Sequence, residues 1–185
     1  MNISRRHFLA TSGAVLAGSA LIHPLLRGQA AAPLSRPAAK LKLAMVGTGG
    51  RGTSMWGRDL MRRYPDRIEF VGLCDTNPGR VEAGREIIGT NCRTYSDLQN
   101  PMAVFEKMIS ETGPDLVMVT SVDATHCDYI VRSMELGVNV LAEKPMVTDE
   151  KQIQQVLDAE NKTGMKTRVA HNVRYSPYEI GRAHV

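Results

Sequence analysis

A glycine-rich segment near residue 50 has the composition and spacing needed to bind a phosphate group. Residues 47–52 read Gly-Thr-Gly-Gly-Arg-Gly, a complete Gly-x-Gly-x-x-Gly pattern that follows an apolar run. Gly47 permits a tight turn, Gly49 lets the backbone approach a pyrophosphate, and Gly52 lets the following helix pack closely on the strand. Amide groups at the start of that helix offer donors and positive potential to an anion. The predicted dinucleotide-binding residues of this segment are Gly47, Gly49, Gly50, Arg51 and Gly52.

Asp75 supplies the second requirement of a dinucleotide site. It directly follows the strand expected at residues 68–73, where a carboxylate accepts hydrogen bonds from ribose hydroxyls and repels a 2′-phosphate. The pattern therefore predicts NAD as the cofactor in preference to NADP. Arg80 lies close enough in sequence to attract a 2′-phosphate, which keeps NADP open as the less favoured alternative.

The elements that must position these residues alternate between strand and helix. The apolar runs predict strands at 41–46, 68–73, 93–95, 116–120, 138–142 and 165–170. Helical patterns occupy 55–64, 78–88, 101–110, 125–136 and 149–163. Strands alternating with helices of this length indicate right-handed crossovers and a parallel sheet covered on both faces. The expected fold class is α/β, a Rossmann-type doubly wound parallel sheet spanning residues 41–171.

Three further segments make the chain resemble the Gfo/Idh/MocA oxidoreductases. Glu-Lys-Pro at 143–145 directly follows the strand at 138–142. Ser-Val-Asp-Ala-Thr-His at 121–126 is similar to the family's Thr-Pro-Asp-x-x-His segment, with Val122 where the family usually has proline. Asn-x-Arg-Tyr at 172–175 resembles the segment that leads into the family's second domain. The resemblance covers residues 40–178.

The resemblance implies hydride transfer between a sugar-like alcohol carbon and the nicotinamide ring, with Lys144 as the catalytic residue. An ammonium group there hydrogen-bonds the substrate oxygen and stabilises developing alkoxide charge, or relays a proton when neutral. Glu143 is expected to orient Lys144 or the cofactor. The alternative for Lys144 is a surface lysine before a turn-forming proline.

The same resemblance assigns cofactor contacts to Ser121, His126, Asn172 and Arg174. His126 equally suits the N-terminal position of a helix. Asn172 and Arg174 contact the cofactor or bridge two domains, and Arg174 alternatively serves as an ion-pair partner.

The N-terminus reads as an export signal. Residues 4–9, Ser-Arg-Arg-His-Phe-Leu, match the twin-arginine pattern, and a weakly apolar stretch follows at 8–26. We expect a signal peptide over 1–32, cleaved after Ala30 or Ala32, and a proline-containing linker over 33–40. The twin-arginine route exports folded proteins, so the cofactor would bind before export to the periplasm. Membrane contact is then only transient; an uncleaved anchor is the alternative.

The C-terminal residues indicate a truncated second domain. In the family a second α/β domain binds substrate, and residues 172–178 are expected to be its start. Residues 179–185, Glu-Ile-Gly-Arg-Ala-His-Val, match what a sequencing adapter encodes, so we expect a non-native tail. The fragment alone is expected to be inactive.

Composition excludes other functions. Aromatic residues make up 5% of the chain, too few for a nucleic-acid stacking platform. Outside residues 1–32 the charge is almost balanced, with 20 basic residues against 19 acidic ones, so no nucleic-acid partner is predicted. The three cysteines, Cys74, Cys92 and Cys127, form no Cys-x-x-Cys pair, so no metal site is predicted and reduced thiols are expected.

Three functions remain from the sequence. The favoured one is an NAD(P)-dependent oxidoreductase acting on a small sugar, polyol or related alcohol, from a parent protein that forms homo-oligomers. The second is an NAD-dependent glycosidase that oxidises a sugar transiently, eliminates its substituent and recycles the cofactor. The third is a non-catalytic dinucleotide-binding module, which would have no need of Lys144 at the hydride position.

Overall fold

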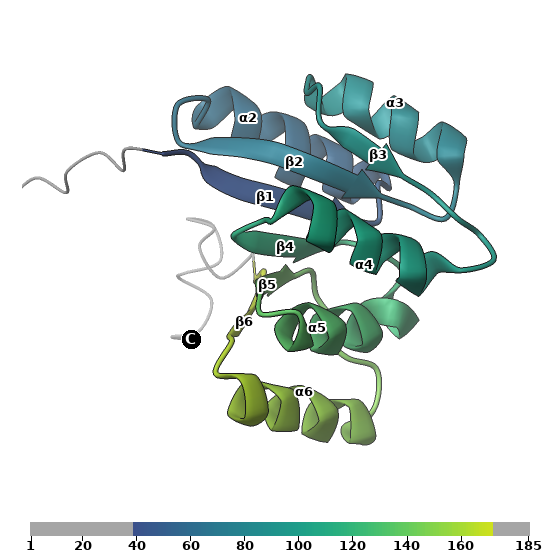
Figure 1. Cartoon of the computed structure of the whole chain (residues 1–185), viewed down its shortest axis with the longest axis vertical. Coiled ribbons are helices and arrows are strands. Elements are labelled where there is room, and N and C mark those ends of the chain that lie inside the picture. The colour runs from purple at the N-terminus through teal and green to yellow at the C-terminus, as the bar shows by residue number, and fades with distance from the viewer. Residues whose placement is uncertain (1–38, 172–185) are drawn as a thin grey trace, which may run out of the picture. The chain divides into compact units, whose positions relative to one another are not determined.

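A six-stranded parallel sheet forms the centre of residues 39–171, the part of the chain that this computed structural model describes (Figure 1). The strands are β1 (Leu41–Val46), β2 (Ile68–Cys74), β3 (Arg93–Tyr95), β4 (Leu116–Val119), β5 (Asn139–Ala142) and β6 (Thr167–Val169). Their order is β3-β2-β1-β4-β5-β6, and every neighbouring pair is parallel. The chain reverses its direction across the sheet between β1 and β4, which confirms the predicted doubly wound fold.

Helices cover the sheet in two layers (Figure 1). The helices are η1 (Gly52–Arg58), α2 (Asp59–Arg63), α3 (Pro78–Ile88), α4 (Pro101–Thr112), the short η2 (Asp123–Thr125), α5 (His126–Glu135) and α6 (Glu150–Thr163). Alternate residues of β1 enter different cores: Met45 packs with Val81 of α3, and Ala44 packs with Phe105 of α4 and Ile130 of α5. The first core therefore belongs to η1, α2 and α3, and the second to α4, α5 and α6.

Local signals in the sequence fix most helix ends. Asn77 accepts a hydrogen bond from the Arg80 amide at 3.0 Å and caps α3, whose first residue is Pro78, as the sequence predicts. Asp149 caps α6 in the same way. Gly137, with φ of +81°, follows α5 at the predicted stop.

The helix predicted at 55–64 is wrong at its start. Helical backbone already begins at Gly50, and Gly52–Arg58 forms a π-helix that continues as α2. Its wide turns end where the Asp59 amide donates to Ser54, five residues earlier. Gly57 is required here, because a Cβ atom at that position would collide with the Ile88 side chain. The first helix therefore follows the glycine-rich segment with no intervening loop. Smaller differences occur elsewhere; the strand predicted at 165–170 forms only over Thr167–Val169.

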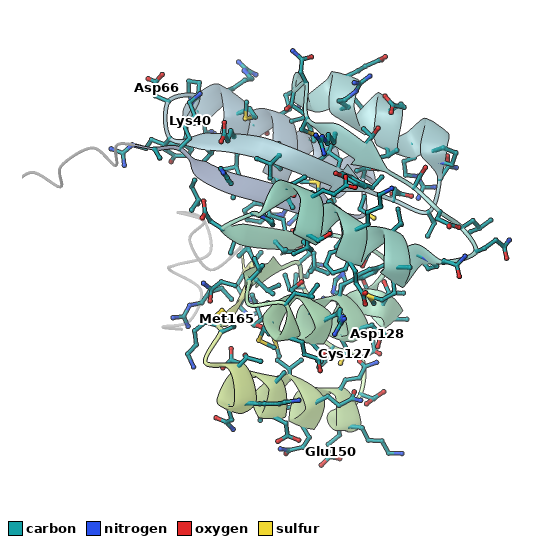
Figure 2. The ribbon with its side chains drawn as sticks, viewed as in Figure 1. Lys40, Asp66, Cys127, Asp128, Glu150 and Met165 are labelled. Carbon is teal, nitrogen blue, oxygen red and sulfur yellow. The ribbon has the colours of Figure 1, made fainter. Side chains whose placement is uncertain are left out.

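The three cysteines are free, as expected, and two of them are buried. Figure 2 shows Cys127 on α5 beside α6, where its thiol lies 3.4 Å from the Gln155 side-chain oxygen. Burial, together with the negative charge of Asp75, raises the pKa of Cys74 to about 12. Among residues 39–171, no helix has the length and apolar character to cross a bilayer, and no three metal-ligating side chains gather.

Candidate functional site

A cavity of about 250 Å³ opens at the carboxyl ends of β1, β2 and β4, where the strand order reverses. Open α/β sheets bind their ligands at this position. The cavity is smaller than the ~300–1,000 Å³ of a complete small-molecule pocket, so it corresponds to part of a dinucleotide site. Its lining residues are Val46, Gly47, Gly49, Asp75, Thr76, Arg80, Thr120, Ser121, Val122 and Tyr129.

The glycine-rich segment has the geometry that a pyrophosphate site needs. Gly47 has a φ of +88°, and a Cβ there would collide with the backbone of Ser121. A Cβ on Gly52 would lie 2.8 Å from the Gly47 carbonyl oxygen. Gly49 and Gly50 differ, since a Cβ on either would meet no atom within 4 Å. The open side of the segment therefore leaves room for a phosphate against the backbone, and the residues present fit NAD.

Asp75 is buried at the end of β2 and accepts three hydrogen bonds from the protein. The amide and hydroxyl of Thr48 donate to Oδ2, at 2.8 Å and 3.0 Å. The Asn77 amide donates to Oδ1 at 3.0 Å, and Arg80 Nη1 lies 3.8 Å from the same oxygen. Asp75 and Arg80 thus form an ion pair on the cavity wall. In the sequence, Asp75 favours NAD and Arg80 favours NADP.

The loop after β4 has a valine, Val122, at a position where proline would also fit. Val122 has φ −71° and ψ 137°, values that a proline also adopts. The Ser121 hydroxyl lies 2.8 Å from the Thr125 hydroxyl, which donates to the Val122 carbonyl. Ser121 lines the cavity.

Glu143 joins the end of β5 to the glycine-rich segment. Its Oε1 accepts hydrogen bonds from Arg51 Nε and Trp56 Nε1, both at 2.7 Å, and its Oε2 accepts from the Lys144 amide at 3.0 Å. Burial raises the pKa of this carboxyl, but the hydrogen bonds from Trp56, Arg51 and the Lys144 amide outweigh it and lower the pKa below its ordinary value. Glu143 is therefore ionised near neutral pH, and it joins Arg51, Trp56 and the Lys144 amide.

Lys144 is exposed at the carboxyl end of β5, two strands from β1. It does not line the cavity, and its ammonium group has no hydrogen-bond or ion-pair partner within residues 39–171. The peptide bond between Lys144 and Pro145 is cis. The arrangement places a cation on the same edge of the sheet as the cavity, beside it and not inside it.

His126 is buried at the start of α5 and holds two loops of the site together. Its Nδ1 lies 2.7 Å from the Pro145 carbonyl oxygen and its Nε2 lies 3.1 Å from the Ser121 carbonyl oxygen. The side chain therefore takes the helix N-terminal position that the sequence offered as an alternative, behind the cavity wall. Through these contacts His126 fixes the Lys144 segment relative to the loop after β4.

The structure adds three residues that the sequence does not single out. Thr48 and Thr120 lie at the base of the glycine-rich segment, where Thr120 Oγ1 donates to the Gly47 carbonyl at 2.6 Å. Trp56 contacts Glu143 from η1. Of these three residues, only Thr48 could have been identified from the sequence, because it lies inside the glycine pattern. Asn172 and Arg174 lie outside the described residues, as do the export signal, residues 33–38 of the linker and the C-terminal tail.

Comparison with known proteins connects this geometry to a family. The profile described as "Oxidoreductase family, NAD-binding Rossmann fold" matches residues 41–171. YteT of Bacillus subtilis (strain 168) is 34% identical over 136 residues, which are 74% of this chain and 31% of YteT. The alpha-N-acetylgalactosaminidase of Shewanella oneidensis is 24% identical over 195 residues, 97% of this chain and 41% of that protein.

Solved structures share the fold. The WlbA dehydrogenase of Bordetella pertussis, crystallised with NADH and UDP-GlcNAcA, superposes with a TM-score of 0.66 at 23% identity, over 76% of this chain and 39% of WlbA. The chain thus spans less than half the length of the relatives it matches.

Proposed function

Because the chain belongs to the Gfo/Idh/MocA family of oxidoreductases and residues 41–171 form its NAD-binding Rossmann domain, we propose that it is part of an enzyme that oxidises a sugar, polyol or related alcohol. The observation that best supports a catalytic role is the contact set of Glu143. Its carboxylate connects Arg51 in the glycine-rich segment to the Lys144 amide. The contact is made by the Lys144 backbone amide, so it positions the segment that carries Lys144 and not the ammonium group itself.

In this proposal, some residues bind the cofactor and Lys144 transfers the proton. Backbone amides of the glycine-rich segment would hold the pyrophosphate, and Asp75 would accept from the ribose. Bound NAD supplies a nicotinamide that accepts hydride. In its neutral form Lys144 would accept the proton of the alcohol O–H as the hydride leaves the carbon and the carbonyl forms, and it would become an ammonium group. Glu143 and His126 fix the segment that carries Lys144.

A sugar-like substrate is the class that the relatives support. WlbA was crystallised with a nucleotide sugar, and the Shewanella relative is named for a sugar derivative. We extend this class to the present chain as part of the proposal.

The test replaces Lys144 in the protein expressed from its native gene. Lys144→Ala should lower the hydride-transfer rate ~100-fold or more, with the Kd for NAD changed by less than about twofold. Lys151→Ala, on the exposed side of α6, is the matched control. Unchanged turnover with a collapsed affinity for NAD would make Lys144 a cofactor contact and overturn its catalytic role.

A transient-redox glycosidase is the second candidate. The observation in its favour is that similarity to the Shewanella protein extends over 97% of this chain, beyond the matched residues 41–171. Such an enzyme oxidises a sugar carbon, eliminates the glycosidic substituent and returns the hydride. Release of an aryl group from aryl glycosides without accumulation of NADH would favour it; stoichiometric NADH would favour the dehydrogenase.

Export is the remaining part of the proposal and rests on residues 4–9. Residues 1–32 fused to a folded reporter should carry it to the periplasm, and replacing Arg5 and Arg6 by lysine should retain the reporter inside. Equal export of both fusions would contradict a twin-arginine signal.

A further inference from the structure

Thr48 directs both of its donors to one oxygen of Asp75. It lies between Gly47 and Gly49 but is buried, with 3% of its surface exposed. Its amide and its hydroxyl both contact Oδ2, whereas the Asn77 amide and Arg80 approach Oδ1. Within residues 39–171, Oδ2 therefore has Thr48 as its only hydrogen-bond donor.

Thr48 is itself held in one orientation by α3. Gly84 of that helix packs directly on it, so that a Cβ at Gly84 would lie 3.0 Å from Thr48 Cβ and 3.4 Å from its methyl carbon. Two neighbouring glycines would otherwise leave this part of the chain free to rotate. A side chain locked by packing can in turn fix the group to which it donates.

We propose that the Thr48 hydroxyl is a specificity-determining group that orients the Asp75 carboxylate for NAD, an inference that rests on the proposed function. With Oδ2 fixed, Oδ1 stays on the side of the cavity that Arg80 lines, and it keeps a lone pair for a ribose hydroxyl. Without the hydroxyl, Oδ2 keeps only the Thr48 amide as a donor, so the carboxylate is held less firmly and the 2′-hydroxyl of NAD meets a less well oriented acceptor.

The effect on NADP is different. NADP carries a phosphate in place of the 2′-hydroxyl, so only its 3′-hydroxyl can donate to Asp75, and the negative charge of Asp75 repels the phosphate whichever way the carboxylate is turned. Loss of the Thr48 hydroxyl therefore weakens NAD selectively. A general loosening of the glycine-rich segment would weaken both nucleotides equally, because both carry the same pyrophosphate.

The experiment measures Kd for NAD and NADP by calorimetry on the full chain. Thr48→Val keeps the shape that packs on Gly84 but removes the hydroxyl. It should raise Kd for NAD about tenfold and leave Kd for NADP within about twofold. Thr48→Ser restores the hydroxyl and should restore the ratio of the two constants.

Thr53→Val is the matched control. Thr53 is equally buried and its methyl also packs on Gly84, but its hydroxyl donates to the Gly49 carbonyl and not to Asp75. Its ratio of Kd values should match that of the unsubstituted chain. Equal weakening of NAD and NADP binding in Thr48→Val, or no change in either Kd, would overturn the proposed role of Thr48. The proposed function of the chain would stand in both cases. Failure of the unsubstituted chain to bind NAD would overturn the proposed function and this inference with it.

Discussion

The Asp75 carboxylate is already held by the protein on several sides before any ribose reaches it. Three protein donors and one guanidinium group surround it, and only 7% of the residue is exposed. Such preorganisation lowers the cost of ordering a side chain when the cofactor binds. Replacing Asp75 therefore has consequences for the fold as well as for nucleotide choice.

Asp75→Ala should weaken NAD more than NADP. Loss of the charge-assisted hydrogen bonds to the ribose costs roughly 2–4 kcal/mol of NAD affinity. For NADP, the substitution also removes the repulsion between the Asp75 carboxylate and the 2′-phosphate. This gain offsets part of the loss in NADP affinity. Titration of both nucleotides against both proteins measures the difference, with Asp97→Ala, in an exposed turn, as the control. Equal weakening of the two nucleotides would separate Asp75 from the 2′-hydroxyl.

Val122 offers a prediction about stability. Because its φ of −71° already suits proline, Val122→Pro should stabilise the protein by about 0.4–1 kcal/mol through the unfolded chain. Denaturant unfolding measures this, and Val122→Ala, which leaves the ring constraint out, should show no gain. A lower stability of the proline variant would mean that the proline ring disturbs the loop even though the φ angle of Val122 suits it.

At the scale of elements, η1 and β5 are connected through one carboxylate. Glu143 accepts from two side chains that η1 and the glycine-rich segment carry. The π-helical turns set where Trp56 lies, and so they help determine where β5 ends and the Lys144 segment begins. π-helical turns are frequent at functional sites for this kind of reason.

Glu143→Gln should change the pH dependence of stability. The lowered pKa of Glu143 means that its ionised form stabilises the fold fully above about pH 4.3, the ordinary glutamate value. That contribution is lost as the pH falls through the lower pKa of the folded state. The unsubstituted chain should thus be more stable than the glutamine variant by about 1–3 kcal/mol near neutral pH. The difference should shrink in acid.

Chemical unfolding at a series of pH values checks this prediction. The exposed Glu86→Gln supplies the control, for which the difference should stay small throughout. A difference for Glu143→Gln that is constant with pH would show that charge has no part in the link between η1 and β5.

The sequence predicts the parallel sheet, its alternation with helices and most helix ends, because these follow from local patterns. Asn77, Asp149 and Gly137 act within a few residues of themselves. It does not predict the π-helical start of the first helix, since apolar spacing is readable only from Met55 onward. Nor does it predict that Trp56 contacts Glu143, 87 residues away, because only the folded sheet brings the two together.

At the scale of the whole molecule, the two faces of the sheet are covered unequally. α5 packs on β4 and β5 in the core that also contains α6. On the opposite face, Leu116 and Leu141 are only partly buried. Among residues 39–171, no helix packs extensively on that face of β5 and β6. An apolar face of this kind favours association.

The full chain should therefore self-associate as its concentration rises. Leu141→Lys places a charge on this face and should shift sedimentation toward the monomer, with a lower melting temperature as well, because Leu141 also packs against the first core. Leu98→Lys, which is exposed in a turn ahead of α4, is the control and should leave sedimentation unchanged. A chain that is monomeric at every concentration would show that this face is covered.

Trp56 is the only tryptophan in the chain, and its indole N–H donates to Glu143. Indole emission responds to the loss of a hydrogen bond to an anion and to the entry of water. The protein thus carries a single fluorophore at the point where the glycine-rich segment, η1 and the end of β5 meet. The emission wavelength of Trp56 should therefore report the assembly of the site directly, with no added label.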